Sequence, residues 1–184
     1  PVALLSLQAA GRIERALVVY VDVHQGDGTA VCFAGDDSVF TFSIHQDDIF
    51  PVPKAISDLD VGMPGGSGDR EVLRELARRL PEVFDRARPD IVYLQAGCDM
   101  LAGDPLADFR MTREGIVRRD LAVVDECVRR GVPVVMVLGG GYSDEAWKVQ
   151  YVSISEIVRR HGRDGGGPAY QPRKMTVKEK GATK

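Results

Sequence analysis

The amino-acid sequence predicts an α/β fold in which helices cover both faces of a mainly parallel sheet. Apolar runs rich in valine, of which residues 17–21 are the clearest, are dense enough to form strands buried on both faces. These runs alternate along the chain with amphipathic segments of helical period, the order expected for βαβ units. The length of 184 residues suits one domain with a substantial core.

The first half of the chain is interpreted as a helix, two strands and a long loop. The helix covers residues 2–10, and Gly11 is placed to end it. Strands follow at residues 17–21 and 38–44, where β-branched and aromatic side chains are frequent. Residues 45–68 contain three prolines and a Gly-Gly-Ser-Gly run, which predicts a functional or mobile loop.

The second half alternates helices with two further strands. Asp69 is expected to cap a helix that runs to about Phe84. Thr112 is expected to cap a second helix, which Gly131 ends. The two strands are predicted at residues 91–94 and 132–138.

A last helix is predicted at about residues 144–160, and it carries an apolar stripe on one face. The stripe consists of Trp147, Tyr151, Ile154 and Val158. From His161 onward the sequence turns to Gly, Pro and Lys, which favours disorder. The expected organisation is therefore one domain at residues 1–160 and a disordered tail at 161–184.

Composition and charge exclude several classes of partner. A net charge of −3 and an isoelectric point near 5.7 argue against nucleic acid or an anionic membrane. No apolar run approaches a bilayer span, and no signal peptide opens the sequence. Three cysteines without C-x-x-C spacing fit reduced thiols and predict a cytoplasmic location. The chain opens at Pro1 directly with helical sequence, so we expect a piece of a longer protein.

Side chains that can do chemistry follow three of the predicted strands. Asp22 and His24 leave the first strand together, and the strand period of two points them to the same side. Asp99 and Tyr142 follow two later strands. Because the carboxyl ends of parallel strands share one edge of the sheet, we expect these side chains to meet. Two carboxylates and an imidazole with open coordination positions are typical of a catalytic zinc site.

Each of these signals also has a structural interpretation, which the spacing leaves open. An Asp-x-His after a strand commonly caps a turn, and residues 139–142 could form a flexible turn with a packed ring. A phosphate-binding loop at Gly139 to Gly141 is another alternative. It is disfavoured because the sequence lacks the G-x-G-x-x-G and Walker spacings and an acid placed to bind ribose.

Three segments resemble, in order and spacing, signature motifs of the zinc-dependent histone deacetylase family. They are Asp22-Val-His-Gln-Gly-Asp-Gly28, Ala96-Gly-Cys-Asp-Met-Leu-Ala-Gly-Asp104 and Leu138-Gly-Gly-Gly-Tyr142. Gln25 stands where many members have a second histidine, which is most similar to the bacterial and class IV branch. The resemblance extends from about Val2 to Arg159. It implies an arginase-like αβα sandwich that hydrolyses N-acetyl groups on amines, usually on lysine side chains.

The resemblance also implies roles for individual residues. Asp22, His24 and Asp99 match the family's zinc ligands. Tyr142 matches the phenol that donates a hydrogen bond to the carbonyl oxygen as it becomes an oxyanion. Asp27 matches an acid that orients a catalytic histidine.

Further positions of the resemblance concern substrate and a second cation. Gly140 and Gly141 match a segment that contacts substrate. Asp22 and Ser43 sit where the family also builds a potassium site, largely from backbone carbonyls. Zinc, and potassium beside it, are therefore the expected cofactors, with acetylated lysine or an acetylated small amine as substrate.

The sequence departs from the family at its proton-transfer residues. The family's paired catalytic histidines lie N-terminal to the matched region, and this chain has no His-His pair. His45 is expected to have a loop or core role, and His161 to lie in the tail. Tyr20 occupies a position where the family often has an aspartate. We therefore expect the metal-binding portion of a deacetylase domain without its N-terminal part.

Two alternative functions stay open at this point. One is a deacetylase of acetylated polyamines or other small amines, because the rim loop at 45–68 is not diagnostic of substrate. The other is a module that binds metal but is catalytically incomplete, which the absent histidines favour for the chain alone.

Overall fold

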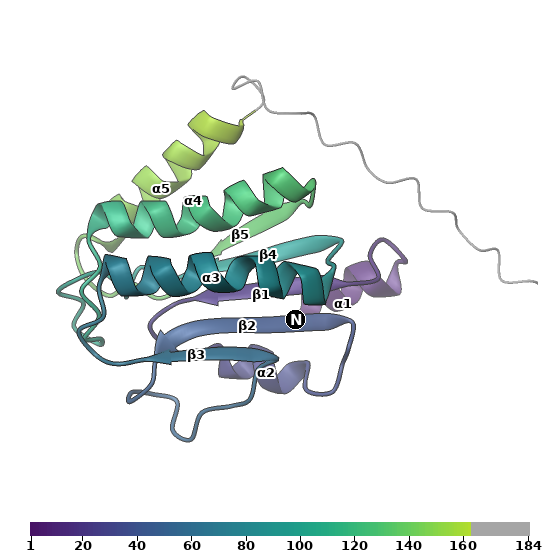
Figure 1. Ribbon diagram of the computed structural model, residues 1–184, viewed down its shortest axis with the longest axis horizontal. Helices are drawn as coiled ribbons and strands as arrows, with labels where there is room; N and C mark the ends of the chain where they lie inside the picture. Colours follow the sequence, from purple (N-terminus) through teal and green to yellow (C-terminus); the bar gives the residue numbers. More distant parts are fainter. Residues whose placement is uncertain (163–184) are drawn as a thin grey trace, which may run out of the picture.

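In a computed structural model of the chain, residues 1–162 are described, and five parallel strands form a single sheet (Figure 1). The strand order is β3-β2-β1-β4-β5, and all four pairings are parallel. The strands are β1 (Ala16–Val21), β2 (Val39–Gln46), β3 (Leu59–Met63), β4 (Ile91–Ala96) and β5 (Val134–Leu138). The helices are α1 (Val2–Ala9), α2 (Asp27–Cys32), α3 (Asp69–Ala87), α4 (Arg113–Arg130) and α5 (Ala146–His161).

The side chains of the central strand β1 divide between two cores. Leu17, Val19 and Val21 belong to the large core that the sheet forms with α3 and α4. Ala16 and Val18 belong to a smaller core under α1 and the end of α2. Burial on both faces explains the unbroken apolar run of β1. The predicted three-layer α/β architecture is therefore confirmed.

Two elements form where the sequence predicted neither a strand nor a helix. The edge strand β3 lies within the expected loop, where it pairs in parallel with β2 from Leu59 opposite Phe42. Its burial is low and alternating, so its own sequence carries little signal. The short helix α2 begins at Asp27, after the N-cap Gly26, in a stretch to which the sequence assigned no element. Tertiary pairing and packing therefore override the local breaker residues in both places.

The N-cap predicted for α4 is correct, whereas the N-cap predicted for α3 is not. Thr112 caps α4 by accepting a hydrogen bond from the Gly115 amide, as predicted. The N-cap of α3 is Gly68, so the prediction for Asp69 was wrong. The Asp69 carboxylate accepts instead from the amide and hydroxyl of Thr112, 2.8 and 2.6 Å away. That side chain thus ties the starts of α3 and α4 together.

The end of the chain differs slightly from the prediction. Helix α5 continues to His161, whose Nε2 atom lies 2.6 Å from Asp125 Oδ1 on α4. The prediction that His161 belongs to a tail was therefore wrong. The remaining residues of the predicted disordered tail, 163–184, lie outside the described part. Among residues 1–162, no helix combines the length and apolarity needed to span a bilayer.

Candidate metal centre and pocket

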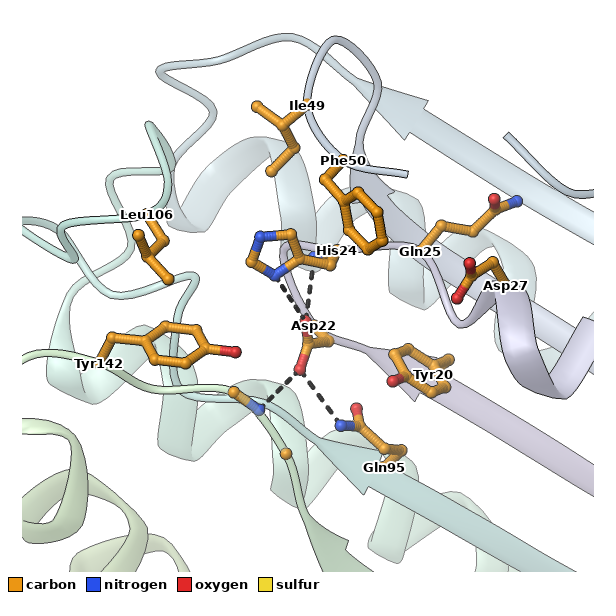
Figure 2. A pocket seen from close by; sticks show the side chains of 12 residues that line it. Tyr20, Asp22, His24, Gln25, Asp27, Ile49, Phe50, Gln95, Leu106 and Tyr142 are labelled. Atoms are coloured by element: carbon orange, nitrogen blue, oxygen red, sulfur yellow. Dashed lines mark hydrogen bonds and ion pairs between the residues drawn. The ribbon is translucent and has the colours of Figure 1, made fainter. Parts of the chain in front are cut away.

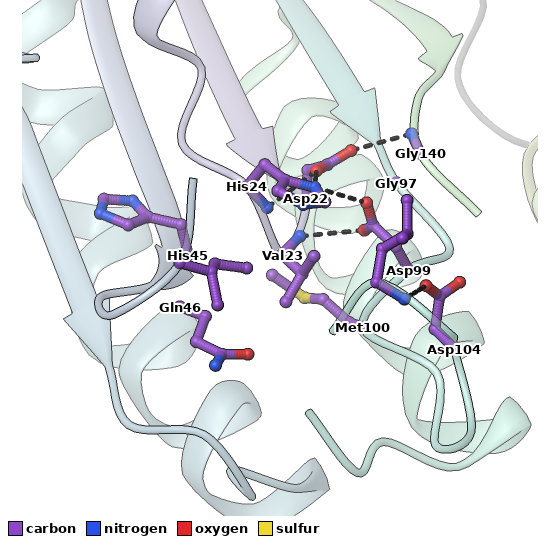
Figure 3. Close-up of polar contacts among 12 residues, drawn as sticks. Asp22, Val23, His24, His45, Gln46, Gly97, Asp99, Met100, Asp104 and Gly140 are labelled. Atoms are coloured by element: carbon purple, nitrogen blue, oxygen red, sulfur yellow. Dashed lines mark hydrogen bonds and ion pairs between the residues drawn. The ribbon is translucent and has the colours of Figure 1, made fainter. Parts of the chain in front are cut away.

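Three side chains predicted as metal ligands converge at the carboxyl end of the sheet (Figure 3). Asp22 and His24 follow the last residue of β1, and Asp99 follows β4, the neighbouring strand. One ligand atom from each residue lies within 4.8 Å of the other two. His24 Nδ1 is 3.1 Å from Asp99 Oδ2 and 3.5 Å from Asp22 Oδ1. The parallel arrangement thus brings together residues more than 70 positions apart in sequence.

Backbone amides hold both carboxylates in place. The Val23 amide donates to Asp99 Oδ1 at 2.9 Å, and the Gly140 amide donates to Asp22 Oδ2 at 2.9 Å. The amide side chain of Gln95 adds a donor to the same Asp22 oxygen at 3.2 Å. Outer contacts of this kind fix the orientation of metal ligands and tune their basicity.

The glycines around the ligands are required by close approach. A Cβ atom built on Gly97 would lie 2.1 Å from Asp22 Oδ2, and one built on Gly140 would lie 1.9 Å from Asp99 Oδ2. Real side chains cannot approach so closely, so any larger residue would displace a carboxylate. These two glycines therefore form part of the cradle around the ligands.

The charges of the cluster are strongly coupled. Burial raises the pKa of Asp22, but hydrogen bonds with His24 and with the Gly140 amide outweigh burial and lower it to about 2. Burial, followed by the negative charge of Asp22, raises the pKa of Asp99 to about 7. The hydrogen bond to Asp22 raises the pKa of His24 against the effect of its own burial. The site therefore concentrates negative charge beside an imidazole that attracts a proton.

This arrangement fits a divalent cation. Asp22 and Asp99 are nearly fully buried, and within residues 1–162 no Lys or Arg forms an ion pair with either. Two buried carboxylates without a cationic side chain are costly, and a bound cation would offset that cost. A set of two carboxylates and one imidazole suits zinc, with positions left open for substrate.

A pocket of about 690 Å³ opens above the cluster (Figure 2). Tyr142 lines it, and its hydroxyl points toward Asp22 and His24. The rings of Tyr142 and His24 stand edge to face, with centroids 6.3 Å apart. Partial burial, followed by the charges of Asp99 and Asp22, raises the pKa of Tyr142. The phenol is therefore protonated at neutral pH and available as a hydrogen-bond donor.

Of the other predicted site residues, some line the pocket and others do not. Asp27 lines the pocket and accepts a hydrogen bond from the Gly28 amide at 2.7 Å. Gly140 also lines it, with its amide committed to Asp22 and its carbonyl accepting from Cys98. Gly141 follows with its backbone close to the side chains of Cys98 and Ala146. The buried Ser43 hydroxyl lies 3.0 Å from His45 Nδ1 on β2, away from the pocket lining.

The chain's other two histidines lie outside the pocket. His45 is a buried residue of β2, and Figure 3 shows its ring projecting away from Asp22 and His24. Of the loop or core role expected for His45, the structure shows the core role. His161 lies at the end of α5, paired with Asp125 of α4. His24 is thus the single histidine among the pocket-lining residues.

Several residues of the site were not predicted. Arg119 is fully buried on α4, and its Nη1 atom donates to the Gly97 carbonyl at 2.7 Å. Asp104 accepts a hydrogen bond from the Tyr142 amide at 2.8 Å. Asp104 ends one of the quoted motifs, so the sequence offered a signal for it. Arg119 looked like an ordinary surface charge on an amphipathic helix. The apolar wall of the pocket comes from Ile49, Phe50 and Leu106.

The chain belongs to the histone deacetylase family, because the model of the histone deacetylase domain matches residues 1–157. An uncharacterized protein of Picosynechococcus sp. is 41% identical over 160 residues, covering 87% of this chain and 51% of that protein. A probable deacetylase of Methanothermobacter thermautotrophicus is 35% identical over 172 residues, covering 87% and 49%.

A solved structure agrees with these relatives. The crystal structure of the HDA15 HD domain superimposes with a TM-score of 0.73 at 28% identity, covering 89% of this chain and 51% of that one. The predicted family and its deacetylase-type αβα fold are therefore confirmed. In each comparison the chain spans about half the length of the relative it matches.

Proposed function

We propose that this chain supplies the metal-binding and carbonyl-polarising part of a zinc-dependent deacetylase that removes acetyl groups from lysine side chains. One observation carries the proposal. Asp22, His24 and Asp99 converge below a pocket into which Tyr142 points its hydroxyl. Membership of the histone deacetylase family supports the choice of an N-acetyl amide as substrate.

The chemistry of these groups assigns each of them a role in the reaction. Zinc held by Asp22, His24 and Asp99 would act as a Lewis acid that polarises the acetyl carbonyl and activates water. The Tyr142 hydroxyl donates a hydrogen bond to the carbonyl oxygen as that oxygen gains negative charge. A single preorganised donor of this kind contributes about 3–4 kcal/mol to transition-state stability.

The residues that line the pocket do not supply the proton transfer that the reaction requires. Among the residues that line it, His24 is assigned to the metal, and Asp27 is assigned the orientation of an imidazole. Loss of general acid–base help typically costs about 10²–10⁴-fold in rate. We therefore propose that the 184 residues bind zinc but hydrolyse acetyl-lysine at a negligible rate by themselves.

Zinc binding is tested by elemental analysis of the purified chain. We expect about one zinc per chain and its loss in Asp99→Ala, since one of three ligands is removed. Asp104→Ala is the matched control, because that carboxylate contacts the Tyr142 amide and not the cluster. Full zinc occupancy in Asp99→Ala would exclude this ligand set.

Activity is tested by comparing the chain with a chimera. In the chimera the chain replaces the matching part of the Picosynechococcus relative, whose remaining half completes the polypeptide. We expect turnover of a fluorogenic acetyl-lysine peptide by the zinc-loaded chimera and none above background by the chain. Equal turnover by both would show that proton transfer occurs within the chain. Faster turnover of an acetylated polyamine would replace lysine as the substrate.

Two minor proposals accompany this function. Potassium near Asp22 and Ser43 stays a prediction, tested by the effect of KCl on zinc affinity. We also propose a cytoplasmic location, which Cys32, Cys98 and Cys127 support as free thiols.

A further inference from the structure

The β2–β3 loop, residues 47–58, supplies Ile49 and Phe50 to the lining of the pocket. Apolar packing holds little of this loop. Phe50, Val52 and Ile56 are 70%, 79% and 87% exposed, and of the large apolar side chains in the loop only Ile49 packs against the large core. Loops with so few packing contacts are usually mobile. The position of the Phe50 ring therefore depends on polar contacts that hold the backbone.

Gln25 holds the second half of the loop. Its side chain is only 3% exposed, and Figure 2 shows it turned away from Asp22 and His24. Gln25 Nε2 donates to the Ala55 carbonyl at 2.8 Å, and Gln25 Oε1 accepts from the Ala55 amide at 2.8 Å. Nε2 also donates to Asp60 Oδ1 on β3 at 3.0 Å. One buried side chain thus binds both backbone groups of Ala55 and ties the loop to the residue after the candidate ligand His24.

Gln46, the last residue of β2, holds the first half of the loop. It is fully buried, and its Nε2 atom donates to Asp48 Oδ1 at 2.9 Å and to Asp108 Oδ2 at 3.1 Å. Its Oε1 atom accepts from the Asp108 amide at 3.1 Å. Asp108 belongs to the segment after β4 that carries Leu106 of the pocket wall. Gln46 therefore connects the two sides of the apolar wall.

Lys54 closes the loop on itself between these two anchors. Its ammonium group donates to the carbonyl oxygens of Ile49 and Pro51. The backbone that carries Phe50 is thus bound at both ends of the loop and again in its middle. An exposed aromatic side chain keeps one place in the pocket because its backbone is held.

We propose that Gln25 and Gln46 are positioning residues that keep the β2–β3 loop as a preorganised wall of the substrate pocket, with Ile49 and Phe50 in place before substrate binds. The proposal rests on the proposed function for the identity of that substrate, an acetylated lysine side chain. A wall that is already ordered costs no loop entropy when substrate binds. Its loss should weaken substrate binding and leave the chemical step unchanged.

The test replaces each glutamine by methionine, which has similar length but lacks the amide donor and acceptor. Gln8→Met is the matched control. Gln8 also tethers a loop, since its Nε2 atom donates to the Ser38 hydroxyl at 2.7 Å, but it lies outside the pocket lining. Comparison with this control separates the loss of a buried hydrogen bond in general from the loss of the wall.

The first measurement is limited proteolysis of the chain alone. Trypsin can cut between Lys54 and Ala55, and the Ala55 amide in that bond is the one that Gln25 binds. Cleavage requires the loop to open locally. We expect Gln25→Met to accelerate this cut at least about 10-fold and Gln8→Met less than about 2-fold, followed by mass spectrometry of the fragments. Cleavage at the parent rate would overturn the proposal.

The second measurement is steady-state kinetics of the zinc-loaded chimera described above. We expect Gln25→Met and Gln46→Met each to raise KM for the acetyl-lysine peptide at least about 10-fold, with kcat within about 2-fold of the parent and full zinc content. If Gln25→Met does not fold, Gln46→Met supplies both measurements. Unchanged KM would make the glutamines structural only and overturn the proposal. A fall in kcat with loss of zinc would assign Gln25 to the support of His24, with the same consequence.

Failure of this proposal and failure of the proposed function are distinguishable. An active parent chimera whose KM is insensitive to both substitutions overturns the proposal and leaves the deacetylase assignment intact. An inactive parent chimera contradicts the assignment, and the affinity for a fluorescein-labelled acetyl-lysine peptide, measured by fluorescence anisotropy, then replaces KM. Affinity reduced at least about 10-fold in Gln25→Met supports the positioning role. Unchanged affinity, or no binding by the parent, overturns it.

Discussion

The guanidinium of Arg119 donates a hydrogen bond of 2.7 Å to the carbonyl oxygen of Gly97, two residues before the candidate ligand Asp99. Arg119 is fully buried, and its Nε and Nη2 atoms also bind Asp120 at 2.9 and 2.8 Å. Asp120 in turn accepts from the Ser153 hydroxyl on α5 at 2.6 Å. This buried network connects two helices to the turn that carries the candidate ligand Asp99.

We expect Arg119→Lys to weaken zinc binding about 10–100-fold, the range seen when outer contacts of metal ligands are removed. Lysine keeps the charge but cannot form the planar fork that holds Asp120 and Gly97 together. The measurement is zinc competition with a colorimetric chelator. Arg118→Lys is the control, because that neighbour is solvent-exposed. Unchanged zinc affinity in a folded Arg119→Lys protein would leave Arg119 a purely structural role.

A glycine substitution tests the geometry of the cradle directly. We expect Gly140→Ala to reduce zinc occupancy severely, since its Cβ would lie 1.9 Å from Asp99 Oδ2 and 3.2 Å from Asp22 Oδ2. Gly28→Ala is the control, because a Cβ there meets no atom within 4 Å. Zinc per chain and far-ultraviolet circular dichroism, measured on both variants, separate loss of the site from loss of the fold. Full occupancy in Gly140→Ala would mean that the ligand loops move freely.

The sequence predicted the central strand β1 better than the edge strand β3 and the short helix α2. The dense apolar run of β1 and the polar residues Asp22 and Asp99 after strands carry strong local signals, so the fold and the convergence of the candidate metal ligands followed from them. β3 depends on pairing with β2, and the six-residue α2 follows Gly26 and contains Gly28, so neither has a local signal of its own. Long-range pairing of this kind is not visible in a single sequence.

Side-chain partners were the least predictable part of the site. Arg119 stands in a helix whose pattern suggests an exposed charge, and only the approach of the Gly97 carbonyl makes it a buried donor. The stripe on α5 was recognised correctly as one face. Its exposure could not be foreseen, because helical periodicity shows which residues share a face and not what covers them.

The stability of the chain should depend on His45 in mildly acidic solution. Burial, with a contribution from Lys54, lowers the pKa of His45 below its ordinary value of 6.5. As the pH falls through that value, the unfolded chain takes up a proton that the folded chain does not, so stability falls. We expect His45→Asn to lose less stability than the parent chain between pH 8 and pH 5.5, measured by urea unfolding. Parallel losses in both proteins would contradict this assignment.

Tyr142 should act on the transition state and not on substrate binding. Tyr142→Phe keeps the ring that faces His24 and removes only the hydroxyl that points toward the cluster. In the zinc-loaded chimera we expect kcat to fall about 10²–10³-fold with little change in KM, as for other single oxyanion donors. The raised pKa of Tyr142 keeps the hydroxyl protonated, so this phenol should not limit activity below its ordinary pKa of 10.0.

The control for this variant is zinc content, which should equal that of the parent chimera because Tyr142 is not among the three candidate ligands. A rise in KM with kcat unchanged would make Tyr142 a residue that packs against substrate. A fall in kcat accompanied by loss of zinc would show that the phenol supports the metal ligands. Only an isolated fall in kcat at full zinc occupancy agrees with a hydrogen bond formed to the developing oxyanion.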